Sequence, residues 1–156
     1  MGRGFTLESR REPVDIEACL AAGQTVQFPI RGWSMYPLLT PGRDSVIVAP
    51  VKLEILRRGD AALYRRDGGI LVLHRIWRVR DGGIWFVGDN QKEVEGPLRP
   101  DQVRGVMTAA IRKGRRIEVT DLRCRLYSRL WLLLRPLRPA ISRAIHALRT
   151  RRGGAG

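Results

Sequence analysis

Three polar side chains of this 156-residue chain belong to the types that hydrolytic enzymes combine. Ser34 follows a short apolar stretch and a glycine, His74 lies within an alternating apolar stretch, and Asp89 follows another apolar stretch. A serine hydroxyl is a weak nucleophile until a base takes its proton, and neutral imidazole suits that task near pH 7. A carboxylate can then hold the imidazole in the required tautomer. The set is therefore compatible with a serine hydrolase.

Each of these residues alone also has an ordinary structural explanation. Serines are common in turns, an aspartate after a glycine often shapes a turn through its side chain, and a lone histidine within a strand is commonly part of the core. What favours chemistry is that the candidates occur together, each on or beside a predicted strand. Four short motifs carry them, in this order: Gly32-x-Ser34-Met35-x-Pro37, Arg58-Gly59-Asp60, His74-Arg75-Ile76 and Gly88-Asp89-Asn90.

This series of motifs resembles the successive boxes of type I signal peptidases and of the superfamily that they share with self-cleaving SOS and phage repressors. The resemblance spans residues 26–106 and is greatest for the branch with a histidine in place of the usual lysine base. It implies that Ser34 is the nucleophile and His74 the general base. It does not decide which acid orients the imidazole. Asp89 is one candidate, and Glu95 is the other, because that branch has a second acid a few residues beyond the Gly-Asp-Asn motif.

The same resemblance implies a mainly β, barrel-like catalytic domain that binds its peptide substrate as an added β-strand. It also implies that the backbone N–H of Ser34 helps to bind the oxyanion. Gly32 occupies the position where many bacterial signal peptidases carry an assisting hydroxyl, so an oxyanion hole made of backbone groups alone is expected. The family's transmembrane anchor has no counterpart here, which suggests a stand-alone member.

The pattern of apolar residues agrees with a β domain over residues 24–119. Short alternating runs separated by Gly-Gly turns indicate hairpins. A short helix is predicted before them, over 14–22, and residues 1–23 are expected to form a lead-in. The predicted strands cover residues 25–30, 45–48, 61–65, 70–80, 84–87, 103–110 and 117–119.

The excess positive charge is concentrated in residues 120–156. This segment holds nine arginines and one acidic residue, while the whole chain has a net charge of +14. Apolar residues at helical spacing predict two basic amphipathic helices, over 122–134 and again from Pro139. Two interpretations stay open. The helices dock on an anionic membrane surface or a protein partner through residues 122–149, or they cover the β core with their arginines in water.

Composition excludes several other classes. Two cysteines and two histidines rule against a disulfide scaffold and a structural zinc site, and we expect no metal or cofactor. The longest apolar run, Leu130–Leu134, is far shorter than a membrane span, so a cytoplasmic protein, peripheral on the inner membrane face, is expected.

From the motifs and the resemblance we predict a serine endopeptidase that cleaves a leader or precursor segment. The alternatives are a catalytically silent peptide-binding module of the same fold, or a basic protein that binds nucleic acid or a membrane surface.

Overall fold

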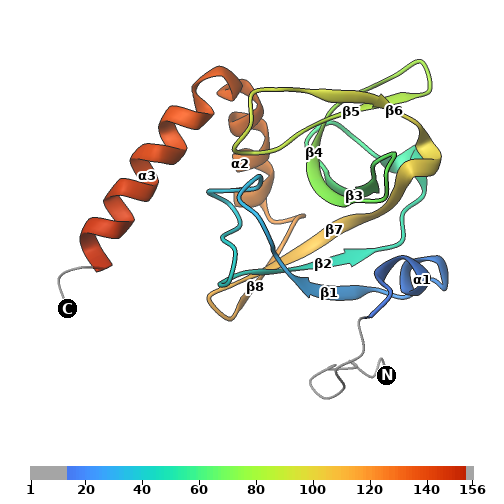
Figure 1. Ribbon diagram of the computed structural model, residues 1–156, viewed down its shortest axis with the longest axis horizontal. Coiled ribbons are helices and arrows are strands. Elements are labelled where there is room, and N and C mark those ends of the chain that lie inside the picture. Colours follow the sequence, from blue (N-terminus) through green and yellow to red (C-terminus); the bar gives the residue numbers. More distant parts are fainter. Residues whose placement is uncertain (1–13, 154–156) are drawn as a thin grey trace.

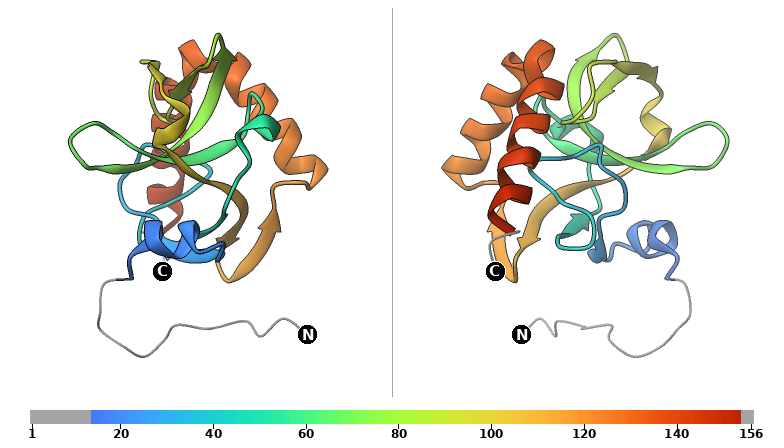
Figure 2. Two further views of the ribbon diagram at one scale, coloured as in Figure 1. Left: turned by 90° about the vertical axis from the view of Figure 1, so that its right-hand side faces the viewer. Right: turned by 60° about the vertical axis from the view of Figure 1, so that its left-hand side comes forward.

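The computed structural model describes residues 14–153, which form one curved antiparallel sheet with a short helix at its start and a helical hairpin on one flank (Figures 1 and 2). The strands are β1 (Val26–Pro29), β2 (Ser45–Ala49), β3 (Ala61–Arg65), β4 (Leu71–Arg80), β5 (Gly83–Val87), β6 (Glu95–Leu98), β7 (Val103–Arg112) and β8 (Arg115–Glu118). The helices are α1 (Ile16–Ala21), α2 (Leu122–Leu133) and α3 (Arg138–Gly153), with short 3-10 turns η1 (Leu53–Ile55), η2 (Pro100–Gln102) and η3 (Arg135–Leu137).

The long strand β7 connects the two halves of the sheet. The strand order is β1-β2-β7-β3-β4-β5-β6, and β8 also pairs with β7. Two cores follow from this arrangement. One packs α1, β1 and β2 around the fully buried Leu39, and the other gathers around Tyr64 and Phe86.

The register of β3 and β4 determines which side chains meet. The turn at Asp67-Gly68-Gly69 pairs Ala62 with His74, so Tyr64 lies two residues along on the same face as His74. The next strand, β5, pairs only with Arg75–Arg80 of β4. Within residues 14–153, the segment 71–74 of β4 therefore has a strand neighbour on one side only.

The prediction of a mainly β fold with an N-terminal helix and a helical C-terminal segment is confirmed. Every predicted strand is present within one or two residues at most ends, and both C-terminal helices form. One strand, β6, was not predicted. The lead-in before residue 14 lies outside the described residues. No helix in the described part of the chain combines the length and apolar character needed to cross a bilayer.

Candidate active site

Ser34 and His74 line the same pocket. It is open to solvent, has a volume of about 230 Å³ and lies between the segment that follows β1 and the start of β4. Its walls include apolar residues from both sides, notably Ile30, Met35 and Leu73, together with the cation Arg66. The structure thus brings together two side chains that are 40 positions apart in the sequence.

The loop that carries Ser34 is held from both ends. Gly32 has a φ of +77°, a left-handed conformation that glycine adopts without steric cost. The carbonyl of Ser34 accepts a hydrogen bond of 2.8 Å from the N–H of Asn90, and a Cβ added at Gly88 would lie 2.8 Å from that same carbonyl oxygen. The first and last of the four motifs are therefore in direct contact.

Two backbone N–H groups of this loop have no hydrogen-bond partner in the described part of the chain. Among residues 14–153, the N–H groups of Ser34 and Met35 donate no hydrogen bond, whereas the next N–H, that of Tyr36, bonds to the carbonyl of Trp33. Unengaged donors next to a nucleophile are what an oxyanion hole requires. The oxyanion hole of backbone groups that the Gly32 position suggested stays a prediction.

The hydrogen bonds of His74 determine its tautomer. The hydroxyl of Tyr64 donates to Oε2 of Glu95 at 2.7 Å and also lies 3.0 Å from Nδ1 of His74. A phenol has a single proton, and here the carboxylate accepts it. The phenolic oxygen can then only accept from His74, so Nδ1 carries the imidazole proton and Nε2 is unprotonated. A general base needs this tautomer.

The charged groups around His74 keep these protonation states in place. Burial lowers the pKa of His74 to about 4, and Glu95 opposes that shift while Arg66 adds to it. Burial, and then the hydrogen bond to Glu95, raise the pKa of Tyr64 far above its usual value, so its hydroxyl stays protonated. Hydrogen bonds from Arg66 hold the pKa of Glu95 below its ordinary value. His74 is therefore neutral and Glu95 ionised at neutral pH.

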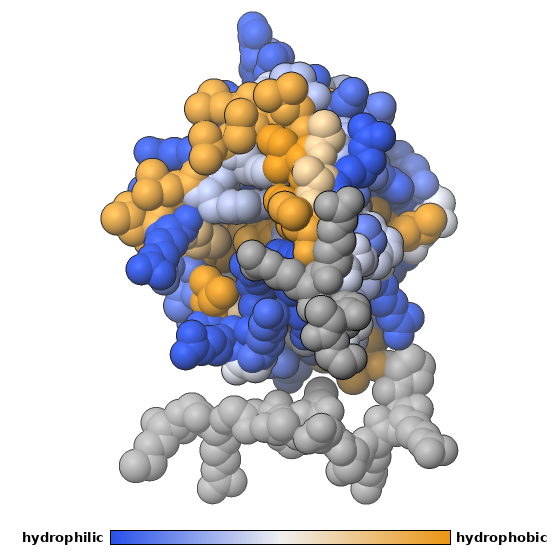
Figure 3. All heavy atoms as spheres, turned by 90° about the vertical axis from the view of Figure 1, so that its left-hand side faces the viewer, coloured by the Kyte–Doolittle hydropathy of each residue, from blue (hydrophilic) through white to orange (hydrophobic). Residues whose placement is uncertain are grey.

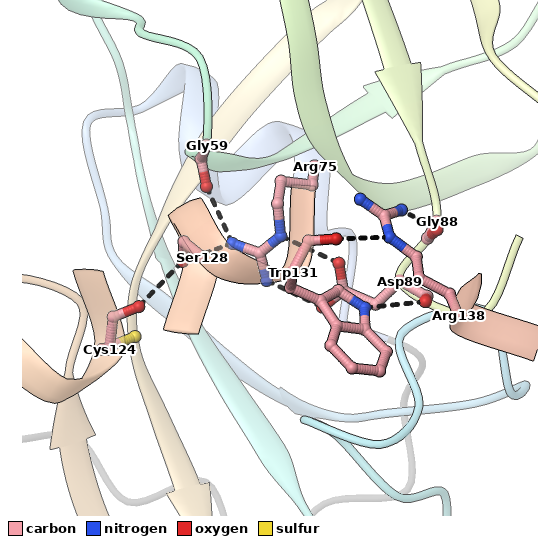
Figure 4. Close-up of polar contacts among 8 residues, drawn as sticks. All are labelled: Gly59, Arg75, Gly88, Asp89, Cys124, Ser128, Trp131 and Arg138. Carbon is pink, nitrogen blue, oxygen red and sulfur yellow. Dashed lines mark hydrogen bonds and ion pairs between the residues drawn. The ribbon is translucent and has the colours of Figure 1, made fainter. Parts of the chain in front are cut away.

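Asp89 has a different environment from Glu95. Its side chain is fully buried and forms two hydrogen bonds, of 2.8 and 2.7 Å, with the guanidinium of Arg75 (Figure 4). Arg75 in turn donates to Ser128 of α2, and the indole of Trp131 donates to the backbone carbonyl of Asp89. These contacts attach α2 to the sheet. Among the described residues, the Asp89 carboxylate has no hydrogen bond to His74.

The four predicted site residues thus fall into two groups. Ser34, His74 and, through Tyr64, Glu95 belong to the pocket, while Asp89 belongs to the junction with α2. The described residues contain no hydrogen bond between the Ser34 hydroxyl and His74. Catalytic hydrogen bonds are often long in ligand-free enzymes and tighten when substrate binds, so this arrangement is compatible with a resting state.

Sequence reasoning missed Tyr64 and Arg66 as parts of the site. The signal was present in the hairpin, because counting back from the Gly-Gly turn places Tyr64 diagonally beside His74. Asp60 of the Arg-Gly-Asp motif accepts a hydrogen bond from the N–H of Arg57, which is the turn-forming role expected of it.

Comparison with protein-family models and with curated proteins found no match to this chain. The arguments for function therefore rest on the motifs and on the geometry of the pocket.

Proposed function

We propose that this protein is a serine endopeptidase in which Ser34 is the nucleophile and His74 the general base. The observation that carries the proposal is the hydrogen-bonded series Glu95–Tyr64–His74, which leaves Nε2 unprotonated on a residue that lines the pocket with Ser34. The resemblance of the motifs to type I signal peptidases supports the same reaction.

The proposed reaction follows the acyl-enzyme route. Oγ of Ser34 attacks the scissile carbonyl carbon while Nε2 of His74 takes the hydroxyl proton, and the N–H groups of Ser34 and Met35 bind the resulting oxyanion. The imidazolium gives its proton to the departing amine, and the acyl-serine forms. Water then attacks the ester with His74 again as base, which releases the acid and restores the serine hydroxyl. Glu95 stabilises the transient imidazolium through Tyr64.

The sheet supports an extended peptide as substrate. Residues 71–74 of β4 have an unpaired edge beside the pocket, and β1, which leads into the opposite wall, pairs only with β2 among the described strands. A peptide lying between these edges gains main-chain hydrogen bonds, and its side chains are selected by shallow pockets. A volume of about 230 Å³ favours small side chains next to the cleaved bond. We propose a leader or precursor segment as the substrate.

The compartment belongs to the same proposal. We place the enzyme in the cytoplasm, peripheral on the inner membrane face, and the surface that supports this attachment is described in the next subsection. The proposed chemistry needs no metal or cofactor, because base, nucleophile and oxyanion donors all come from the chain.

The decisive experiment compares protein N-termini in cells that carry the wild-type gene or a Ser34→Ala replacement. We expect a set of N-termini that requires Ser34 and also His74, which His74→Ala tests, with purified wild-type protein cleaving the corresponding peptides. Ser45→Ala, at the half-buried start of β2, is the matched control and should leave cleavage unchanged. Retained cleavage by the Ser34→Ala protein would refute the proposal.

A silent peptide-binding module is the second candidate. The observation in its favour is that no hydrogen bond joins Ser34 to His74 in the described part of the chain. It predicts that wild-type protein binds extended peptides without cleaving them, and that Ser34→Ala changes neither the N-termini in cells nor the affinity for peptide.

A further inference from the structure

The outer face of α2 carries a line of exposed leucines. Their exposed fractions are between 55% and 73%, and their spacing of three or four residues places them on one side of the helix and its continuation. The residues are Leu122, Leu126, Leu130, Leu133 and, in η3, Leu137. The opposite face of α2 holds the buried Trp131 and Leu132. An exposed apolar stripe of this size on a water-soluble protein usually marks an interaction surface.

The second helix, α3, buries two polar residues against the body of the protein and exposes part of its apolar face. Arg138 and Ser142 of α3 are buried against the body, whereas its alanines and Leu148 are largely exposed. Arg138 donates to the backbone carbonyls of Trp131 and Gly88, which explains why a cation lies inside. Ile141 and Ile145 of α3 are half-buried and Arg143 and Arg149 are exposed, so both interpretations of these helices stay open. Figure 3 shows apolar side chains gathered over this flank of the molecule.

The charge around these apolar faces has one sign. Residues 122–150 contain seven arginines and no acidic residue. On α2, Arg123 lies on one side of the leucine stripe and Arg125 and Arg129 lie on the other, all three exposed. A second copy of this chain would bring like charges together, so a self-association surface is disfavoured. Leucines bordered by arginines are instead typical of helices that lie in the headgroup region of an anionic bilayer.

A cationic pocket adjoins the leucine stripe. It has a volume of about 440 Å³ and is lined by Leu133 and its neighbours and by three cations, Arg58, Lys92 and Arg135. The guanidinium groups of Arg58 and Arg135 lie 4.4 and 4.9 Å from the ring centroid of Trp77, which fixes their positions. Within residues 14–153, none of the three cations has a carboxylate partner.

We propose that α2, η3 and α3 form a docking face for an anionic membrane, in which the pocket around Trp77 binds the phosphate of a lipid headgroup. Three cations without a carboxylate partner, two of them packed against Trp77, supply the charge that a phosphate group requires. Leu133, at the edge of the pocket, is placed to contact the acyl region beside that headgroup. This inference goes beyond the proposed peptidase activity and does not depend on it.

The docking face also contacts the loop of the candidate nucleophile. The imidazole of His146 lies 6.0 Å from the ring of Trp33 and 6.2 Å from the ring of Tyr36, and Arg149 lies over the ring of Tyr36. Membrane attachment would therefore hold α3 against residues that flank Ser34. A substrate segment near the bilayer surface would then be delivered to the side of the protein that bears the pocket.

Vesicle co-sedimentation of the full chain tests the proposal. We expect binding to phosphatidylcholine vesicles containing 30% phosphatidylglycerol at least about tenfold tighter than to pure phosphatidylcholine, since each cation at an anionic surface contributes about fivefold. High salt should remove most of this preference. Equal affinity for the two vesicle types, or no binding to either, would overturn the proposal. Ser34→Ala should bind as wild type, which separates this test from that of the peptidase activity.

Matched variants separate the two parts of the docking face. Leu130→Gln is expected to weaken vesicle binding about tenfold, whereas Ile70→Gln, an equally exposed residue in the β3–β4 turn, should not. Lys92→Gln should weaken binding about fivefold, and Arg99→Gln, which removes the same charge beside η2, should have little effect.

If Arg99→Gln weakened vesicle binding as much as Lys92→Gln, the binding would reflect general charge attraction, and the proposed headgroup site would be overturned. If Ile70→Gln weakened binding as much as Leu130→Gln, the role of the leucine stripe would be overturned. The wild-type protein could instead be a dimer that Leu130→Gln converts to a monomer, with neither protein binding vesicles. That result would overturn the membrane proposal and show that the leucine stripe binds a second copy of the chain.

Discussion

Two carboxylate–guanidinium pairs lie near the candidate base, and they differ in exposure. The Asp89–Arg75 pair is sealed, with side chains 0% and 2% exposed, while the Glu95–Arg66 pair is partly open, with side chains 28% and 39% exposed. Both pairs are bidentate. The sealed pair joins the helical hairpin to the sheet, and the open pair acts on His74 through Tyr64. Six positions in the sequence separate an acid that joins the helices to the sheet from one that is hydrogen-bonded, through Tyr64, to the candidate base.

The largest expected effect comes from breaking the sealed pair. Asp89→Asn leaves the buried Arg75 guanidinium without a counter-charge, and we expect the free energy of unfolding to fall by about 3–5 kcal/mol. Urea denaturation measures this loss. Asp81→Asn, which breaks the exposed pair with Arg80, is the matched control and should cost under about 1 kcal/mol. An Asp89→Asn protein of normal stability but without activity would move the orienting role from Glu95 to Asp89.

The second-largest expected effect is the pH dependence of stability that His74 causes. The pKa of His74 is about 4 in the folded protein against 6.5 as the ordinary value, so between these pH values the unfolded chain binds more protons. The free energy of unfolding therefore rises with pH across this window. The contribution of His74 is complete above pH 6.5 and is lost as pH falls toward 4, with a total of about 3 kcal/mol.

Urea denaturation between pH 4.5 and 6.5 measures the effect before most carboxylates titrate. His74→Asn should flatten the slope. A wild-type slope that equals the slope of His74→Asn would contradict the burial argument.

A smaller effect is expected on kcat/KM when the Glu95–Arg66 pair is no longer linked to His74 through Tyr64. Glu95→Gln and Tyr64→Phe should each lower kcat/KM about 10- to 100-fold, because the imidazolium loses its distant counter-charge or its link to it. The double variant should lose no more than the worse single variant, since both act through one series of bonds. Additive losses would show that Tyr64 and Glu95 act separately. Asp101→Asn, an exposed acid in η2, provides the control.

The smallest effect concerns the pH dependence of kcat/KM. Its acid limb should lie near pH 4, where His74 titrates, and activity should be flat between pH 5.5 and 7.5. Arg66 lowers the pKa of His74 and Glu95 raises it. Arg66→Gln should therefore move the acid limb to higher pH by a few tenths of a unit, and Glu95→Gln should move it to lower pH. Shifts in the same direction would exclude the proposed electrostatic roles.

The fold was largely predictable from sequence, because the strands alternate and the Gly-Gly turns are strong hairpin signals. The exception, β6, contains Gly96 and Pro97, two residue types that are depleted in strands. This strand carries Glu95. Because β6 was not predicted, the sequence did not show how Glu95, six positions after Asp89, comes close to His74. The pairing of β5 with β6 brings it there.

The roles of the two acids could not be assigned from sequence. Both follow β5 in the sequence, and contacts with distant residues distinguish them: Asp89 pairs with Arg75 beneath α2, and Glu95 accepts a hydrogen bond from Tyr64. The burial of Arg138 in α3 escaped prediction for a related reason. Periodicity separates the apolar from the polar residues of a helix, but the burial of this arginine depends on the carbonyl oxygens of Trp131 and Gly88 inside the protein.

The attachment of α2 to Asp89 also has a consequence for biosynthesis. Trp131 and Arg138 are made 42 and 50 residues after the carbonyl groups to which they donate. While a nascent chain ends before α2, the Arg75–Asp89 pair has no cover, and the neighbouring Asn90, which holds the Ser34 loop, lacks its support. We expect ribosome-bound chains stalled before residue 122 to be inactive on a peptide that the released protein cleaves. The proposed proteolytic activity would then begin only after the C-terminal helices have been translated.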